Sequence, residues 1–296
     1  CKNTLMYPLE RLTGIKRRRM AGEFEFAIDL AKQAVAMCLE RSKYSAADVE
    51  LLICCNISRY DGPDFHFSFE PSTSVRLKKH FGLSEALCFD ISNACAGMFT
   101  GTHIADAFLQ AGLVKTALVV SGEYITHLTR TAQYEITHTR DERLACLTLG
   151  DSGAAILLER SQDSKTGFHR IDMFTLGRYS DCCIAKPTSS EAGGAIMLTD
   201  SLRIHAVAIK ESVKHVIKVL KEVKWSRKKL QHFIMHQTAH SAINELARQF
   251  NELYHAKVLD SRNMIYNLEE RGNTSSTTHF VAIWDNIHNG KIKNGD

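Results

Sequence analysis

Cys95 stands where a predicted strand gives way to a predicted helix. The segment 88–98 begins with apolar strand residues, passes through the small residues 92–94 and enters a helix at about Ala96. Unpaired N–H groups and the positive end of the helix dipole favour a thiolate at such a helix start. We therefore expect Cys95 to be a nucleophile that carries an acyl group as a thioester. Its alternative, a buried structural cysteine, is what we expect of most of the other eight.

Two later segments offer partners to this thiol. The apolar run 233–235 ends on His236, and Asn273 lies in a turn rich in Gly, Ser and Thr. A neutral imidazole and a carboxamide both donate hydrogen bonds to a developing enolate oxygen without protonating it. Taken one at a time, His236 would be a hydrogen-bonded core histidine and Asn273 a turn former. Together the three residues predict carbon–carbon bond formation rather than hydrolysis.

Composition excludes several classes of protein. The chain has 296 residues, 44% of them hydrophobic and 24% charged, enough for one large domain or two of about 150 residues. A net charge of +4 is too small to indicate nucleic-acid binding. No run of 18 apolar residues predicts a spanning helix, and the first residues lack the apolar core of a secretory signal. Nine cysteines without a Cys-x-x-Cys pair predict no metal site and a reduced, cytoplasmic setting.

Hydrophobic periodicity predicts alternating strands and helices. This alternation favours an α/β fold with a largely parallel, buried sheet. The segment 144–159 reads as two strands around the tight turn Gly150–Gly153. We place the boundary between an N-terminal half (1–165) and a C-terminal half (166–296) in the polar stretch 161–167. The predicted helices cover about 23–43, 74–81, 96–110, 202–224, 239–254 and 275–289, and the other predicted strands about 49–56, 88–91, 116–121 and 231–235.

Four motifs occur in the order typical of one family. Asn93–Gly97, Gly150–Ala155, His236–Gln237 and Gly272–Ser276 make the chain resemble β-ketoacyl-acyl-carrier-protein synthase III, a thiolase-fold condensing enzyme. The resemblance implies a five-layer αβαβα fold of two pseudo-duplicated halves. It also implies that Cys95 accepts an acyl group and that a malonyl- or 3-oxoacyl-thioester condenses with it in fatty acid or polyketide-type synthesis. No cofactor or metal is expected, and the partners would be acyl carrier protein or coenzyme A thioesters and a second copy of the chain.

Some positions depart from the family's pattern for coenzyme A. Pro8 stands where the family has an aromatic residue that stacks on adenine, Leu12 where it has an arginine, and Ser241 where an arginine helps to dock carrier protein. Arg143 matches the family's other adenine-contacting arginine. The basic run 16–19 could contact a pantetheine phosphate or a carrier protein. The departures at Pro8 and Leu12 favour a carrier-protein-bound acyl donor over acyl-coenzyme A.

Two further groups of residues are candidates for binding. The aromatic side chains in 59–69 could line an acyl pocket, form a dimer seam or simply pack; they are Phe65, Phe67 and Phe69. The lysines spaced three and four apart in the predicted helix 202–224 could dock an acidic carrier protein or form a solvated face; they are Lys210, Lys214, Lys218 and Lys221.

Two rival functions stay open at this point. An acyltransferase of the same fold would use His236 as a general base on an oxygen or nitrogen acceptor. A non-catalytic partner subunit is the other rival, although such subunits usually lose the nucleophile that this chain keeps. The resemblance implies that the chain lacks the family's first and last core strands, so we expect the natural protein to be longer.

Overall fold

The structure is a computed structural model that describes residues 8–60, 69–163, 165–188, 194–226 and 230–296. The strands are β1 (Leu51–Cys54), β2 (Leu87–Asp90), β3 (Thr116–Glu123), β4 (Ser152–Glu159), β5 (Cys183–Pro187), β6 (Ala195–Thr199), β7 (Phe233–Ile234) and β8 (Met264–Ile265). The α-helices are α1 (Leu9–Thr13), α2 (Ala27–Glu40), α3 (Thr73–Phe81), α4 (Gly97–Gln110), α5 (Thr126–Glu135), α6 (Ser201–Glu222), α7 (His240–Leu253), α8 (Leu268–Arg271) and α9 (Thr278–His288). Short 3-10 turns are η1 (Ala46–Asp48), η2 (Ala94–Ala96), η3 (Glu142–Thr148), η4 (Gly177–Cys182) and η6 (Ser275–Thr277).

A four-stranded sheet in the order β2-β1-β3-β4 supports the first half of the chain. β1 pairs in parallel with β2 and β3, and β4 pairs antiparallel with β3. Alternate residues of β1 face opposite sides, so that Leu52 packs with α2 and Leu51 with α4. Every residue of β1 and β3 is buried, which explains why both strands read as continuous apolar runs.

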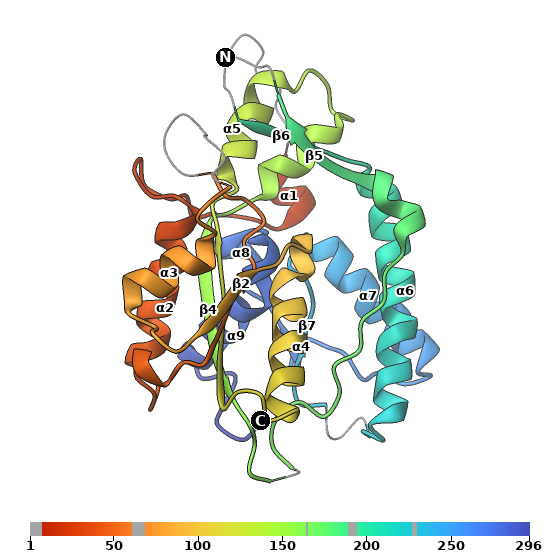
Figure 1. Cartoon of the computed structure of the whole chain (residues 1–296). Coiled ribbons are helices and arrows are strands. Elements are labelled where there is room, and N and C mark those ends of the chain that lie inside the picture. Colours follow the sequence, from red (N-terminus) through yellow and green to blue (C-terminus); the bar gives the residue numbers. More distant parts are fainter. Residues whose placement is uncertain (1–7, 61–68, 164, 189–193, 227–229) are drawn as a thin grey trace.

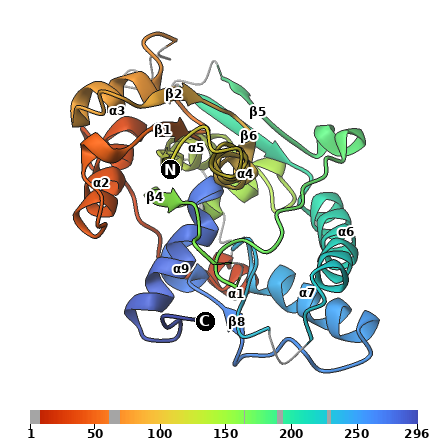
Figure 2. The same ribbon diagram turned by 60° about the horizontal axis from the view of Figure 1, so that its bottom comes forward.

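The layers follow one another from α2 and α3 to α6 and α7. Figure 1 shows α2 and α3 on one side of the first sheet, and α6 and α7 at the opposite side of the molecule. α4 packs on β1 and β3, and α9 contacts β4 as well as β7 and β8. α6 and α7 cover a core formed with β8, in which Phe250 and Ile243 are fully buried. The turned view in Figure 2 shows the same succession, which agrees with the expected αβαβα order.

The described part of the second half contains two small strand pairs. β7 and β8 form a parallel pair two residues long, and β5 and β6 form a separate antiparallel pair. β6 packs with α5 and η3 in a cluster that includes Leu128, Cys146 and Ile196. The proposed boundary between 1–165 and 166–296 stays a prediction. Backbone and side-chain hydrogen bonds join residues 148–152 of the first half to residues 273–277 of the second.

The predicted hairpin at 144–159 is wrong. Only its second strand, β4, is present, and the residues before it form η3. Asp141 caps that turn by accepting a hydrogen bond from the Arg143 N–H at 2.9 Å. Gly150 then donates its N–H to the Asn273 carbonyl at 2.9 Å. The backbone between η3 and β4 is therefore bound to the C-terminal half and not to a hairpin partner.

Candidate active site

The end of β2 fixes the backbone that leads to Cys95. Asp90 accepts hydrogen bonds from the N–H groups of Thr73 and Ser74, at 3.0 and 2.8 Å, and so joins β2 to the start of α3. Ile91 continues the ladder by donating to the Cys54 carbonyl at 2.9 Å. The chain then turns through η2 into α4, and Cys95 is the central residue of that turn. The structure thus confirms the predicted strand, turn and helix.

Two features bring this turn close to the sheet. Ala94 has a φ of 42°, a left-handed conformation that costs a non-glycine residue about 1 to 2 kcal/mol. Gly101 lets α4 approach β1, because a Cβ there would lie 2.6 Å from the Cys55 Sγ. Backbone strain of this kind is concentrated at functional sites, where the surrounding structure holds it in place.

The Asn273 turn is built on the same end of the first half. Asn273 donates its N–H to the Thr148 carbonyl at 2.9 Å and forms a β-bridge with Leu149. Gly272 before it has φ 69° and ψ −159°, a region open in practice only to glycine. A Cβ on Gly272 would also lie 2.6 Å from the Thr148 oxygen. Glycine is therefore required by the backbone at position 272.

The amide of Asn273 is oriented by the next turn. Its Oδ1 accepts the Ser275 N–H at 3.0 Å, so its NH2 group is left to donate elsewhere. Ser275 has a φ of 56°, and its hydroxyl donates to the Cys95 Sγ at 3.7 Å. The structure therefore brings Cys95 and the Asn273 turn into contact. We did not predict a role for Ser275, although it lies within the Gly272–Ser276 motif.

His236 follows β7 and is held by its neighbour. Gln237 is fully buried and donates through Nε2 to the carbonyls of Met235 and Ile265, at 2.8 and 3.3 Å. The His236 Nδ1 is buried without a hydrogen-bond partner in the described chain. Burial, and then the nearby His205, lower the pKa of His236 to about 4. The imidazole is therefore neutral near pH 7 and able to donate one N–H.

A second imidazole joins His236 to the rest of the site. The ring of His279, in the first turn of α9, lies 5.7 Å from the His236 ring. On its other side it meets Phe99 edge to face at 4.7 Å, one turn after Cys95 on α4. No hydrogen bond joins His236 to Cys95 or Asn273 among the described residues. We did not predict His279; a histidine six residues after Asn273, at the start of a helix, was the available signal.

Burial of its sulfur opposes the thiolate form that the helix start favours at Cys95. By surface area Cys95 is exposed, yet the protein atoms that crowd its sulfur are the first cause of a raised thiol pKa, about 11. The hydrogen bond from Ser275 lowers this pKa, while the charges of Glu123 and Cys183 raise it. With a pKa of about 11, the thiol form of Cys95 is favoured near pH 7.

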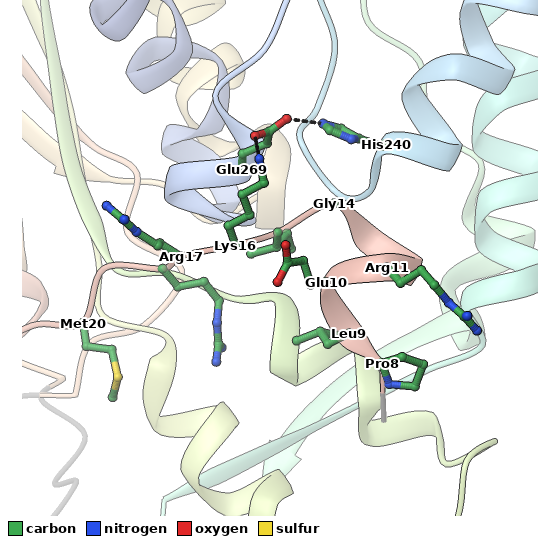
Figure 3. A pocket seen from close by; sticks show the side chains of 12 residues that line it. Pro8, Leu9, Glu10, Arg11, Gly14, Lys16, Arg17, Met20, His240 and Glu269 are labelled. Carbon is green, nitrogen blue, oxygen red and sulfur yellow. Dashed lines mark hydrogen bonds and ion pairs between the residues drawn. The ribbon is translucent and has the colours of Figure 1, made fainter. Parts of the chain in front are cut away.

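A cavity of about 920 Å³ opens beside the Asn273 turn. Figure 3 shows Glu269 reaching both Lys16 and His240 in this cavity, at 2.6 and 3.8 Å. Arg18 lines the cavity and also packs against Gly272, the residue before Asn273: a Cβ added to Gly272 would lie 3.0 Å from the Arg18 Cγ. We predicted the basic run but neither His240 nor Glu269. His240 lines the cavity together with the charged residues Glu10, Arg11, Lys16, Arg17, Arg18 and Glu269.

Arg143 lies outside the lining of this cavity. Its guanidinium pairs with Asp141 at 2.7 Å and with Glu135 at 2.9 Å. The hydrogen bond to Asp141 is the main reason that the pKa of Arg143 is raised above its ordinary value. The predicted adenine contact stays a prediction, and the guanidinium already has two carboxylate partners.

The other predicted binding residues are placed only in part. Phe65 and Phe67 lie outside the described residues, and Phe69 is exposed. Lys210, Lys214, Lys218 and Lys221 all lie exposed on α6, as the spacing predicts. Lys214 pairs with Glu211, and Lys218 pairs with Asp172 and Glu222. Carrier-protein docking on this face of α6 stays a prediction. Carboxylates already neutralise part of the positive charge of the four lysines.

Neither a metal centre nor a membrane span is found in the part of the chain that the structure describes. No three His, Cys, Asp or Glu side chains there are grouped so that they could hold a metal ion. Among the same residues, every helix is too short or too polar to cross a bilayer.

Known proteins match this chain over nearly its whole length. The β-ketoacyl-[acyl-carrier-protein] synthase III of Sulfurimonas denitrificans is 26% identical over 97% of this chain and 83% of its own. The enzyme of the same name from Laribacter hongkongensis is 27% identical over 96% and 82%. The chain therefore spans more than four fifths of these relatives.

Solved structures show the same fold. OleA from Xanthomonas campestris with bound cerulenin matches with a TM-score of 0.81 and 24% identity, over 97% of this chain and 80% of that one. The synthase III of Thermus thermophilus matches with a TM-score of 0.79 and 21% identity, over 97% and 84%. Both confirm the predicted thiolase-like architecture.

Two family models cover the residues that build the site. The model described as 3-oxoacyl-[acyl-carrier-protein (ACP)] synthase III matches residues 89–177, which include Cys95. Its C-terminal counterpart matches residues 220–296, which include His236 and Asn273. The chain belongs to the 3-oxoacyl-[acyl-carrier-protein] synthase III family of condensing enzymes.

Proposed function

We propose that this chain is a ketosynthase, an acyltransferase that joins two acyl groups by Claisen condensation in fatty acid synthesis. The observation that carries the proposal is the contact between Cys95 and the turn that presents the Asn273 amide. A nucleophile and a non-titrating donor on adjoining turns suit the formation of an acyl-enzyme and then of an enolate.

The first half-reaction loads Cys95. Its sulfur adds to the carbonyl carbon of an acyl thioester as the thiol proton leaves. The bond from the acyl carbon to the donor sulfur then breaks, and the donor thiol takes up a proton. Because one thioester replaces another, the exchange costs little free energy. Since the resting thiol has a raised pKa, donor binding must supply the stabilisation that ionises it.

The second half-reaction makes the carbon–carbon bond. A malonyl thioester loses its carboxylate as CO2, and the electron pair of the broken bond forms an enolate. His236 and Asn273 would donate hydrogen bonds to the enolate oxygen, each worth about 2.7 to 4 kcal/mol in a dry site. The enolate carbon attacks the acyl carbon, the bond to Cys95 breaks, and the electron pair returns to the sulfur. The neutral state of His236 fits a donor that does not protonate the enolate.

Acyl carrier protein is the donor that we favour. The cavity beside Gly272 is lined by Arg11, Lys16, Arg17 and Arg18, which suit the phosphate of a phosphopantetheine arm. Pro8 lies at its rim and offers no aromatic face on which an adenine ring could stack. The arm is common to carrier protein and coenzyme A, whereas the adenine belongs to coenzyme A alone.

Intact-protein mass spectrometry tests these steps. We expect an acyl adduct from acyl-carrier protein, faster than from the matching acyl-coenzyme A, and its loss in Cys95→Ala. Cys183→Ala, which removes another exposed thiol, should keep the adduct. Malonyl-carrier protein should discharge the adduct as a 3-oxoacyl product. Discharge onto an alcohol or amine without loss of CO2 would instead indicate an acyltransferase, and no adduct at all would indicate a non-catalytic subunit.

A further inference from the structure

Glu123 is a fully buried carboxyl that the proposed reaction does not use. It is the last residue of β3 and has no solvent-exposed surface. A carboxyl in such a position must be held by hydrogen bonds or stay protonated, because burial disfavours its charge. Glu123 is held by hydrogen bonds and can also take up a proton near neutral pH.

One oxygen of this carboxyl connects three segments. Oε1 accepts hydrogen bonds from the hydroxyl of Ser121 at 2.7 Å, from the hydroxyl of Ser276 and from the Ile57 N–H at 3.4 Å. Ser121 belongs to β3, Ser276 to η6, and Ile57 follows β1. The hydroxyl oxygens of Ser276 and Ser121 lie 2.9 Å apart, so the two side chains meet at the same carboxyl oxygen. Since Ser275 is the next residue, the carboxyl supports the turn that touches Cys95.

The other oxygen is free to hold a proton. Oε2 is buried and makes no hydrogen bond in the described chain. Burial raises the pKa of Glu123 to about 7, against the hydrogen bonds from Ser276, Ser121 and Ile57 that lower it. The carboxyl is therefore able to change its charge near neutral pH without leaving its three partners.

That charge acts on the nucleophile. A charged Glu123 raises the pKa of the Cys95 thiol, and the same charge disfavours the thiolates of Cys54 and Cys55 at the end of β1. Asp90 on β2 acts on Cys54 and Cys55 in the same direction, and Asp151 before β4 raises the pKa of Glu123 itself. No ionisable group is present in η6. The α2 residues closest to Gly122 are Ala27 and Ala31, which carry none either.

We propose that Glu123 is a positioning residue that sets the reactivity of Cys95, by holding the Ser275–Ser276 turn that contacts the thiol and by carrying a charge that acts on it. The role rests on the proposed function, because it assumes that Cys95 is the acylated group. A neutral carboxyl lets the thiol ionise when a donor binds, and also favours the anionic enolate of the second half-reaction. A charged carboxyl keeps the resting enzyme in its thiol form.

Alkylation of Cys95 by iodoacetamide measures this effect without any acyl substrate. Peptide mapping would give the rate at Cys95 alone between pH 6 and 10, so that failure of the condensing reaction would leave the measurement intact. Glu123→Gln keeps an oxygen acceptor but removes the charge. If the thiol pKa falls by about one unit, alkylation near pH 8 should be about threefold faster, since a tenfold gain in thiolate is partly offset by its lower nucleophilicity.

Two further variants make the result decisive. Asp106→Asn removes a carboxylate from α4 eleven residues beyond Cys95, about 16 Å along the helix, and should leave the profile unchanged. Ser276→Ala keeps the carboxyl but removes a hydrogen bond that lowers its pKa, so the rate should rise by a smaller factor. Should Glu123→Gln fail to fold, Ser276→Ala tests the same point. A pH profile identical to that of the unaltered chain in either variant would overturn the proposal.

Discussion

The two sides of the site are supported in different ways. Cys95 and Asn273 rest on the four-stranded sheet and are positioned by backbone hydrogen bonds, such as those from Ile91 to Cys54 and from Asn273 to Thr148. His236 follows a strand of two residues and is positioned mainly by ring packing against His279. Hydrogen bonds therefore fix the directions of the side chains on the first side, whereas the side chain on the second side is buried and makes few polar contacts.

This difference matches the chemistry expected of each side. A nucleophile and a carboxamide donor need fixed directions, which hydrogen bonds provide. A neutral imidazole needs a low pKa, which burial provides without any charged partner. His236 and His279 both have a buried Nδ1 without a partner, which costs stability and keeps both rings uncharged.

The largest effect should come from removing either enolate donor. We expect Asn273→Ala and His236→Ala each to lower kcat for condensation by about 10² to 10³, because each removes one hydrogen bond made in the transition state. Acylation of Cys95 should change far less in His236→Ala, since no hydrogen bond joins the two side chains. Stopped-flow product formation and adduct mass spectrometry separate the two steps. Equal loss of acylation and condensation would make His236 the base for the thiol instead.

The next effect concerns the backbone next to Asn273, on the side of the site that is positioned by hydrogen bonds. Gly272→Ala should lower the free energy of unfolding by about 3 kcal/mol, because its backbone region excludes side chains and its Cβ would meet the Thr148 oxygen. Gly82→Ala is the matched control, with a φ of 65° and nothing within 4 Å of an added Cβ. That variant should lose only about 1 kcal/mol. Urea denaturation measures both, and equal losses would mean that the clash at Gly272 relaxes.

Glu123→Gln should stabilise the fold at alkaline pH. The pKa of Glu123 is about 7 in the folded chain, above the ordinary value of 4.5, so between these values the folded state binds more protons than the unfolded one. Stability is therefore lost as the pH rises from 4.5 through 7. By pH 8 the neutral variant should be more stable by roughly 2 to 3 kcal/mol, and below pH 4 it should not differ. A difference that does not change with pH would remove titration as the cause.

The sequence predicted the first side of the site better than the second. Cys95 and Asn273 lie in local motifs whose turn residues determine their own backbone, so their place in turns could be predicted from a few neighbours. Glu123 is a polar residue that ends a continuous apolar strand, yet its link to Ser276 spans 153 residues and needs the fold. The predicted hairpin at 144–159 failed for the same reason, since Gly150 bonds to Asn273 across the chain. His279 could be placed beside His236 only by packing of α9 against β7.

The smallest expected effect is the pH dependence of stability that comes from His279, on the second side of the site. Burial lowers the pKa of His279 to about 3, below the ordinary value of 6.5, so between these values the unfolded state binds more protons. Stability then falls as the pH drops below 6.5. His279→Phe keeps a ring against Phe99 but removes this titration, and should raise the free energy of unfolding by about 1 to 2 kcal/mol more at pH 5 than at pH 8. His255→Phe, on an exposed turn after α7, is the control for adding a ring. Urea denaturation at the two pH values measures this difference. If the variant gains the same free energy of unfolding at both pH values, the gain comes from packing and not from the lowered pKa of His279.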